Sequence, residues 1–125
     1  MEFKKNQTIY LQIADFICEN ILTHKWPEEE KIFSVRELAA KIEVNPNTVM
    51  RTFSHLQEMG IIYNKRGIGY FVAQGAPKKI KDMQKQEFIK QELPEVFKKM
   101  DLLQIDFAEL EKIYQKLNSN GQAKA

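Results

Sequence analysis

One short helical stretch carries the side chains best suited to chemistry in this chain. A helix that begins at Pro46 advances by about 100° per residue, which places Asn47, Arg51 and Ser54 together on one side. Thr48 flanks this polar face, and Arg51 lies at its centre. Arginine is the usual bidentate reader of guanine in a DNA major groove, so the pattern indicates contact with base edges. The alternative is a helix face that is polar only because water covers it.

Other sets of residues that could support chemistry lack the necessary spacing. We find no carboxylate pair, Ser/His/Asp set or Cys/His set typical of a catalytic site. Gly67 and Gly69 lie between two predicted strands, whereas a nucleotide-binding glycine loop precedes a helix. Cys18 is the single cysteine, and neither histidine stands at a metal-ligand spacing from it. We therefore expect no enzyme activity, no cofactor and no metal site.

Two short helices with their caps are predicted to position the polar face. Ser34 and Glu37 have the S-x-x-E spacing of a capping box, which predicts a helix of about two turns after Ser34. Asn45 is a favourable N-cap, and Pro46 suits the first helical position, so a second helix should run from Pro46 to about Met59. Ser34 and Asn45 are therefore expected to act first as caps and second as contacts to DNA phosphates.

Two β-rich runs follow the second helix. Residues 61–63 and 70–72 flank a polar, glycine-containing loop of six residues, which predicts a hairpin. A helix–turn–helix followed by a hairpin is a winged helix. Arginine favours narrow minor grooves, and glycine lets backbone approach the sugar–phosphate wall, although the loop could also be a simple turn. We predict DNA contact for three loop residues: Lys65, Arg66 and Gly67.

Charge supports a phosphate contact at the first of the two helices. Arg36 lies in its first turn, where the helix macrodipole disfavours a cation, so a nearby phosphate is more plausible than a solvated arginine. The whole chain has a net charge of only +2, but residues 34–75 hold five basic groups against three acidic ones. The acidic run at residues 28–30 lies outside this segment. A local basic patch that a dimer presents twice suffices for binding a polyanion.

Three sequence blocks resemble a known family. The blocks S-V-R-E-L-A, V-N-P-N-T-V-x-R and G-I-I-Y-x-x-R-G-x-G-Y-F-V begin at Ser34, Val44 and Gly60. Their order and spacing strongly resemble the DNA-binding domain of the GntR superfamily of bacterial transcriptional regulators. The remainder resembles the tail of the YtrA-like subfamily, which implies homodimerisation through that tail. The chain departs locally from the family pattern, which usually has Pro at the position of Phe33 and a Pro/Gly-rich turn at residues 28–30.

The chain beyond the hairpin has the pattern of two amphipathic helices. The Gly-Ala-Pro sequence at residues 75–77 is predicted to interrupt regular secondary structure. A lysine-rich segment follows, and apolar residues recur at helical spacing from Ile89. Pro94 either starts a new helical segment or kinks one continuous helix. A D-x-x-E box at Asp106 caps another helix after a turn near Gln104.

Two helices of this size cannot bury both apolar stripes against each other, so a partner surface is implied. We predict a homodimer interface formed by Ile89, Leu93, Phe97, Met100, Leu110, Ile113, Tyr114 and Leu117.

We therefore predict a mainly α protein with a small β-hairpin. Residues 1–75 form a winged helix-turn-helix DNA-binding domain, with a first helix at residues 8–24, and residues 76–125 form a helical dimerisation tail. The expected core of the first domain consists of Ile13, Ile17, Leu38, Val49, Phe53, Leu56 and Ile62.

The expected function is sequence-specific regulation of transcription. A homodimer would bind a palindromic DNA operator and repress by blocking polymerase. The alternative is a protein–protein adaptor built on a winged-helix scaffold. The hydrophobic content of 43%, the lone cysteine and the lack of a long apolar run favour a cytoplasmic protein with no membrane partner. About 50 residues follow the hairpin, too few to enclose a ligand pocket of about 300 Å³ in one chain, so any effector would bind at the dimer interface.

Overall fold

The computed structural model describes residues 7–121 and the side chains of residues 7–119. The chain forms two compact units, the first ending at Met83 and the second beginning at Gln84. The functional division after Gly75 stays a prediction. Among the described residues, no helix is long and apolar enough to cross a bilayer.

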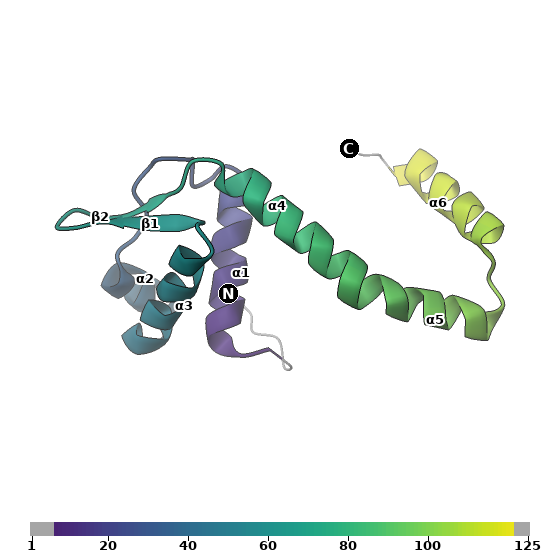
Figure 1. Cartoon of the computed structure of the whole chain (residues 1–125), viewed down its shortest axis with the longest axis horizontal. Helices are drawn as coiled ribbons and strands as arrows, with labels where there is room; N and C mark the ends of the chain where they lie inside the picture. Colours follow the sequence, from purple (N-terminus) through teal and green to yellow (C-terminus); the bar gives the residue numbers. More distant parts are fainter. Residues whose placement is uncertain (1–6, 122–125) are drawn as a thin grey trace. The chain divides into compact units, whose positions relative to one another are not determined.

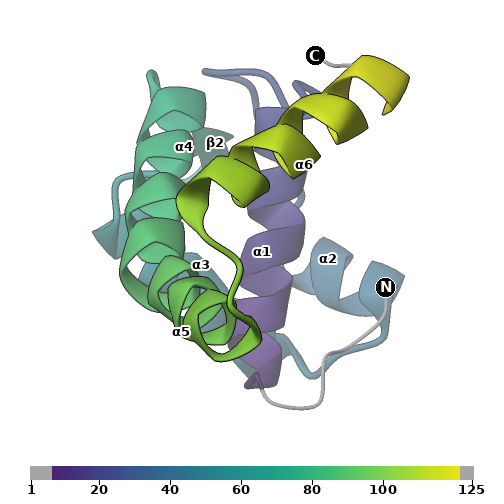
Figure 2. The same cartoon turned by 90° about the vertical axis from the view of Figure 1, so that its right-hand side faces the viewer.

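Three helices form the framework of the first unit. Helix α3 (Pro46–Glu58) packs against both α1 (Ile9–Leu22) and α2 (Val35–Ile42), as Figure 1 shows. Figure 2 shows α1 along its length. Helix α1 ends two residues earlier than expected, because His24 adopts a left-handed backbone conformation with φ +62°. All seven predicted core residues are buried: Ile13, Ile17, Leu38, Val49, Phe53, Leu56 and Ile62.

The predicted helix caps are present. The Ser34 hydroxyl accepts a hydrogen bond from the Glu37 N–H (3.1 Å), and the Glu37 carboxylate accepts one from the Ser34 N–H (2.9 Å). The Asn45 side-chain oxygen accepts a bond from the Asn47 N–H at 2.8 Å, and Pro46 occupies the first turn of α3. These caps satisfy helix N–H groups that have no partner within the helix, and so they set where α2 and α3 begin.

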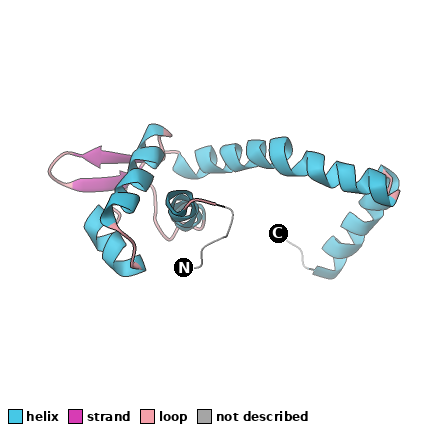
Figure 3. Cartoon of the chain, turned by 90° about the horizontal axis from the view of Figure 1, so that it is seen from below, coloured by secondary structure: helices cyan, strands magenta, loops and turns pink. Residues whose placement is uncertain are grey.

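The hairpin is tighter than the sequence predicted. Strands β1 (Ile62–Lys65) and β2 (Gly69–Val72) pair antiparallel with Lys65 opposite Gly69, which leaves a loop of residues 66–68 (Figure 3). The expected six-residue loop is therefore wrong, since both of its ends belong to the strands. The Ile68 N–H donates to the Lys65 carbonyl at 2.8 Å, and Gly67 has φ +80° at the third position of this turn. A type II turn requires positive φ at that position, which favours glycine.

The acidic loop between α1 and α2 extends the sheet. The Ile32 N–H donates to the Tyr70 carbonyl at 2.9 Å, and the Val72 N–H donates to the Glu30 carbonyl at 3.0 Å. The Glu28 carboxylate accepts a hydrogen bond of 2.6 Å from the Gly75 N–H. This loop therefore supports the base of the hairpin, a role that the charge pattern alone did not reveal.

The lysine-rich segment that follows Gly75 is helical. Helix α4 (Ala76–Glu87) buries Ala76 and Ile80 in the core of the first unit. The Lys79 ammonium approaches the carbonyl of Gly60, just beyond the end of α3, at 3.5 Å. A cation at this position interacts favourably with the C-terminal end of the α3 dipole.

The second unit contains the predicted helices. The π-helical turn η1 (Phe88–Glu92) leads directly into α5 (Leu93–Leu103), and α6 (Phe107–Gly121) follows (Figure 1). The Leu93 N–H bonds to the Phe88 carbonyl five residues earlier, so the turn widens immediately before Pro94, which has no N–H to donate. The backbone therefore remains helical past the proline, which favours the continuous-helix alternative.

The turn and cap between the last two helices match the prediction. Gln104 has φ +58° and ends α5, and the Ile105 N–H bonds to the Met100 carbonyl at 2.9 Å. The Asp106 carboxylate accepts a bond of 2.9 Å from the Glu109 N–H, which caps α6. No side chain from residue 84 to residue 119 is buried.

Candidate nucleic-acid interface

The polar face of α3 faces solvent. Asn47 and Arg51 are exposed, Thr48 is half-buried, and the opposite side is held in the core by Val49 and Phe53, both with 0% exposure. The predicted division of this helix into a core side and a solvent side is thus confirmed. Its hydrogen-bonding side chains are presented on a fixed helix.

Thr52 makes a contact that the apolar pattern of α3 did not predict. It is fully buried, and its hydroxyl lies 2.9 Å from the carbonyl oxygen of Tyr10 and 3.2 Å from that of Thr48. The bond to Tyr10 joins α3 to the first turn of α1. Hydrophobic spacing could not reveal it, because a threonine hydroxyl belongs to neither an apolar stripe nor a charged face.

Arg51 is exposed but already has an aromatic neighbour. Its guanidinium carbon lies 4.0 Å from the centroid of the Tyr10 ring. His55 also lies beside Tyr10: its ring centroid is 5.8 Å from that of Tyr10, and the two rings are at an interplanar angle of 89°. Tyr10 was not predicted at this site from the sequence, since it belongs to another helix, α1.

The starts of α2 and α3 present the other predicted phosphate contacts. Ser34 is half-buried, while Arg36 and Asn45 are exposed. The cap hydrogen bonds use the side-chain oxygens of Ser34 and Asn45 as acceptors, which leaves the Ser34 O–H and the Asn45 amide N–H groups as possible donors to a phosphate. The Ser34 N–H also lowers the pKa of the Glu37 carboxyl, because the hydrogen bond favours its charged form.

The hairpin tip is exposed, and its base is reinforced by aromatic contacts. Lys65, Arg66 and Gly67 are all exposed. The Lys65 ammonium lies 4.8 Å from the centroid of the Phe71 ring, and Phe71 stacks on Tyr63 with a centroid distance of 5.7 Å. These contacts hold the Lys65 side chain against the sheet.

Lys31 is a basic residue near the hairpin that the sequence analysis missed. Its backbone pairs with Phe71 in the sheet. A Cβ atom placed on Gly69 would lie 2.8 Å from the Lys31 Cε, so the glycine leaves room for the lysine side chain. The acidic residues that precede Lys31 do not have the pattern of a strand, so the position of Lys31 beside the hairpin could not be predicted from the sequence.

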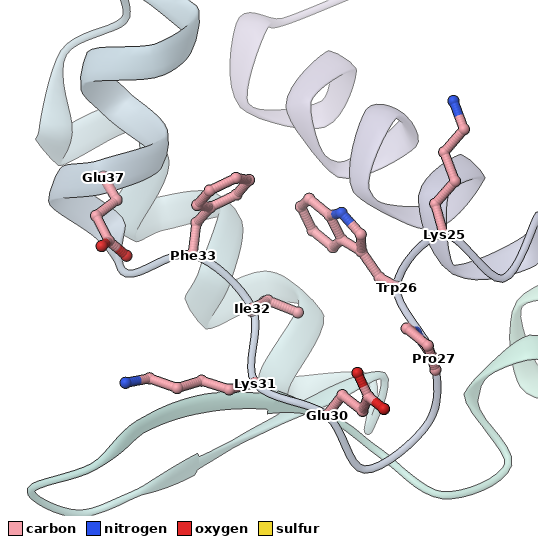
Figure 4. A pocket seen from close by; sticks show the side chains of 8 residues that line it. All are labelled: Lys25, Trp26, Pro27, Glu30, Lys31, Ile32, Phe33 and Glu37. Carbon is pink, nitrogen blue, oxygen red and sulfur yellow. The ribbon is translucent and has the colours of Figure 1, made fainter.

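A small hollow lies beside the start of α2 (Figure 4). Figure 4 shows the side chains of Trp26 and Phe33 pointing toward each other; their rings meet in a T-shaped contact, with a centroid distance of 5.8 Å and an interplanar angle of 74°. Phe33, immediately before the cap of α2, is partly buried and packs against the core. The hollow has a volume of about 340 Å³ and is lined by Lys25, Trp26, Pro27, Glu30, Lys31, Ile32, Phe33 and Glu37. Its lysines and glutamates give it mixed charge, so it has no single electrostatic preference.

The described residues offer no metal centre, since no group of three or more His, Cys, Asp or Glu side chains among them could hold an ion. Cys18 is buried, and loss of hydration raises the pKa of its thiol to about 12, with a further contribution from Asp15. The thiol therefore remains protonated at neutral pH and packs as a small apolar side chain.

The predicted dimerisation residues all lie in the second unit. Leu93, Met100 and Leu110 are half-buried, and the other five are exposed; Phe97 and Tyr114, for example, are 47% and 66% exposed. Phe88, Val96, Leu102, Leu103 and Phe107 add exposed apolar surface that the prediction did not include. The helical spacing from Ile89 thus predicted an apolar stripe, and the exposed apolar surface extends beyond the residues predicted for the interface.

Comparison with known proteins identifies a family pattern in the first unit. The profile described as bacterial regulatory proteins, gntR family, matches residues 9–72. The chain is 41% identical over 75 residues to the uncharacterised HTH-type transcriptional regulator YhcF of Bacillus subtilis (strain 168), covering 60% of this chain and 62% of YhcF. It is 37% identical over 73 residues to the HTH-type transcriptional repressor YtrA of the same organism, covering 58% of this chain and 56% of YtrA. The chain thus spans about three fifths of the length of these curated relatives.

Two solved structures are also similar to the chain, and the first of them extends the similarity over most of its length. A putative transcriptional regulator of the GntR family from Bacteroides thetaiotaomicron is 46% identical, with a TM-score of 0.81 and coverage of 90% of this chain and 97% of that one. The DNA-binding domain of AraR, in complex with its operator ORR3, is 26% identical, with a TM-score of 0.53 and coverage of 58% of this chain and 88% of that one.

Proposed function

This chain belongs to the gntR family of bacterial regulatory proteins, which are transcriptional regulators and not enzymes, and we propose that it represses transcription as a homodimer on a palindromic operator. Its DNA-binding domain is the winged helix of the first unit. The mode of regulation, the symmetry of the operator and the oligomeric state are the parts that this proposal adds.

The exposed polar face of α3 is the observation that carries the proposal. Helix α3 is anchored by a fully buried side, so its other side can enter a major groove without loss of core contacts. We propose that Arg51 contacts a guanine edge and that Asn47 and Thr48 contact neighbouring bases or phosphates. The solved complex of the related AraR domain with operator DNA supports DNA as the partner.

The remaining contacts would fix the helix in register. Arg36 and the donors of Ser34 and Asn45 lie at the starts of α2 and α3, where unsatisfied N–H groups also favour anions. We assign the hairpin tip, with Lys65, Arg66 and Gly67, to the adjacent minor groove. Phosphate contacts of this kind provide affinity, whereas the contacts of α3 provide sequence preference.

The second unit supports a dimer because its apolar side chains lack cover within the chain. Exposed residues such as Phe97, Ile113 and Leu117 would be buried against the same residues of another copy. A two-fold dimer presents two copies of α3 to successive major grooves, which are about 34 Å apart. Repression then follows if the bound dimer excludes polymerase, and the similarity to YtrA, an HTH-type transcriptional repressor, supports this choice. We place the protein in the cytoplasm, where such operators lie.

The exposed apolar surface also favours a second candidate, an adaptor that binds another protein. Binding through apolar surface depends weakly on salt, whereas binding to DNA phosphates weakens steeply as salt rises. The salt dependence of complex formation therefore separates the two functions.

Selection from DNA tests the proposal. The full chain would be incubated with a duplex library that has a randomised core, and bound duplexes would be sequenced after repeated rounds at two salt concentrations. We expect an inverted repeat to be enriched, and its affinity to fall by about 10³ or more between 50 and 200 mM salt if at least six phosphates are contacted. Absence of any enriched motif, or salt-independent binding, would contradict DNA-specific regulation and favour the adaptor.

A further inference from the structure

Tyr10, in the first turn of α1, lies against the proposed base-reading face of α3. Its ring supports the Arg51 guanidinium at 4.0 Å and lies nearly perpendicular to the ring of His55, one helical turn further along α3. We propose that Tyr10 is a positioning residue that holds Arg51 in the orientation used to read a base, an inference that rests on the proposed function.

The stack leaves the hydrogen-bonding edge of Arg51 available. A guanidinium binds a ring through its flat face and binds guanine through the N–H groups at its edge, so both contacts can exist together. Within the described part of the chain, Arg51 forms no ion pair or hydrogen bond. Tyr10 can therefore restrict the plane of the guanidinium without occupying the donors that a base needs.

Tyr10 can orient Arg51 only if its own position is fixed. A hydrogen bond of its backbone and the burial of the next turns of α1 both fix that position. Its carbonyl oxygen accepts the hydrogen bond of 2.9 Å from the buried Thr52 hydroxyl. The adjoining part of α1 is anchored in the core through Ile13 and Ile17, both with 0% exposure. The position of the Tyr10 ring therefore depends on the position of α1, and movement of α1 relative to α3 would alter the orientation of Arg51.

The other arginines of the chain provide a useful contrast. Among the described residues, Arg36 and Arg66 have no aromatic ring within cation–π distance, and only Arg51 does. Arg36 and Arg66 are proposed to contact the DNA backbone or the minor groove, where a mobile cation is sufficient. A bidentate contact to one base requires a defined plane, and a side chain ordered before binding loses less conformational entropy when DNA arrives. The ring thus lies beside Arg51, the arginine proposed to make a bidentate contact to a base.

A matched pair of substitutions tests the inference. Tyr10→Leu removes the ring face but keeps an apolar side chain, and Tyr10→Phe keeps the ring. The probe is the duplex most enriched by the wild-type chain, together with duplexes that change one base pair per half-site. Arg51→Ala first identifies the base pair whose preference depends on Arg51.

We expect Tyr10→Leu to reduce discrimination at that base pair by about two- to fivefold, the range of an exposed cation–π contact. Tyr10→Phe should restore wild-type discrimination. In an Arg51→Ala chain, Tyr10→Leu should cause no further loss of discrimination, because the residue that it positions is absent. A general structural role would instead weaken binding to all duplexes alike and persist without Arg51.

NMR provides a readout that does not require DNA. A guanidinium over a tyrosine ring experiences its ring current, so the Cδ protons of Arg51 should be shifted upfield in the wild type and in Tyr10→Phe but not in Tyr10→Leu. If Tyr10→Leu fails to fold, Tyr10→Met serves as the ring-free variant. Unchanged or improved discrimination in a folded ring-free variant would overturn the inference, and improvement would mean that the ring masks Arg51. Absence of any base preference in the wild type would instead overturn the proposed function.

Discussion

The helices of both units carry apolar stripes, but the first unit buries these stripes and the second leaves them exposed. In the first unit the apolar side chains of α1, α2 and α3 converge on one core, and Ile13, Leu38 and Phe53 are completely buried. In the second unit η1, α5 and α6 also carry apolar residues at helical spacing, yet no side chain from residue 84 to residue 119 is buried. Amphipathic spacing therefore predicts a helix and its apolar face, but it does not say which surface covers that face.

This difference assigns different tasks to the two units. The first has the core needed to hold α3 and the hairpin in fixed positions, as a DNA-reading surface requires. The second exposes large apolar residues, including Leu102 at 79% exposure, which favours contact with another molecule. If another copy of the chain provides that contact, the second unit determines affinity for paired sites and the first unit determines sequence preference.

Charging the apolar stripe of the second unit should have the largest effect. Phe97→Asp together with Leu110→Asp would place two carboxylates in the proposed interface and dissociate the dimer. Affinity for an inverted repeat should fall by about 10²–10⁴, because the second half-site would no longer be bound intramolecularly. Sedimentation reports the mass and a gel shift reports the affinity.

The control for this change adds the same charge on polar, exposed positions of the same unit. Gln91→Asp together with Gln115→Asp should leave both mass and affinity close to wild type. A double Phe97/Leu110 variant that remained a dimer with full affinity would move the interface elsewhere, and the first unit would then be the candidate.

Removing Arg51 should have the next largest effect. Arg51→Ala should cost about 1–3 kcal/mol of binding free energy and relax the preference for one base pair per half-site. Arg36→Ala is the comparison: it should weaken binding to every sequence alike and lower the salt slope by about one. Both are measured by gel-shift titration against duplexes with single base-pair changes. If Arg51→Ala altered neither affinity nor preference, α3 would not be the reading helix.

The hairpin tip should show a smaller effect that requires two variants. Gly67 has φ +80°, and a Cβ atom at this position would meet no atom within 4 Å, so the backbone angle alone accounts for the glycine in the free protein. Gly67→Asn is tolerated at such angles and should change thermal stability little, whereas Gly67→Val should be strained. If DNA approaches this backbone closely, both variants should bind DNA several-fold more weakly. Full affinity of Gly67→Asn would mean that the glycine is only a turn residue.

The capping box should give the smallest change, confined to the stability of the first unit. Ser34→Ala removes the cap of α2 and should lower the free energy of unfolding by about 1 kcal/mol, measured by urea denaturation. The pKa of Glu37 is lower in the folded chain than its ordinary value of 4.5, so its contribution to stability is present above pH 4.5 and is lost as the pH falls through the folded pKa. Ser34→Ala keeps the backbone N–H that is the main cause of the lowered pKa, so Glu37→Gln, which has no titrating carboxyl, is the variant that should lose this acid dependence. An identical pH profile in Glu37→Gln and the wild type would show that the box contributes no charge-dependent stability.

Local signals in the sequence predicted the features that depend on local chemistry. The boxes at Ser34 and Asp106, the N-cap at Asn45 and the buried side of α3 follow from hydrogen-bonding groups and spacings within a few residues. The sequence blocks beginning at Ser34, Val44 and Gly60 predicted the family for the same reason, since each is short and continuous.

Features that depend on distant contacts were missed or misplaced. Glu30 and Lys31 form a sheet edge only because the hairpin lies next to them, and the stack of Tyr10 on Arg51 joins residues from two helices. The hairpin loop was predicted too long because polar Asn64 and Lys65 extend β1 through backbone pairing, which their side chains do not indicate. The lysine-rich start of α4 was likewise not recognised as part of the first unit, whose core receives Ile80.

One titration tests the central proposal, that two copies of α3 are held together by the second unit, most directly. The full chain would be titrated onto the selected inverted repeat and onto the same duplex with one half-site scrambled, and native mass spectrometry would count the chains bound. We predict two chains per intact duplex in one cooperative step, with affinity at least about a hundredfold above that for the scrambled duplex. One chain per duplex, or equal affinity for the two duplexes, would contradict it.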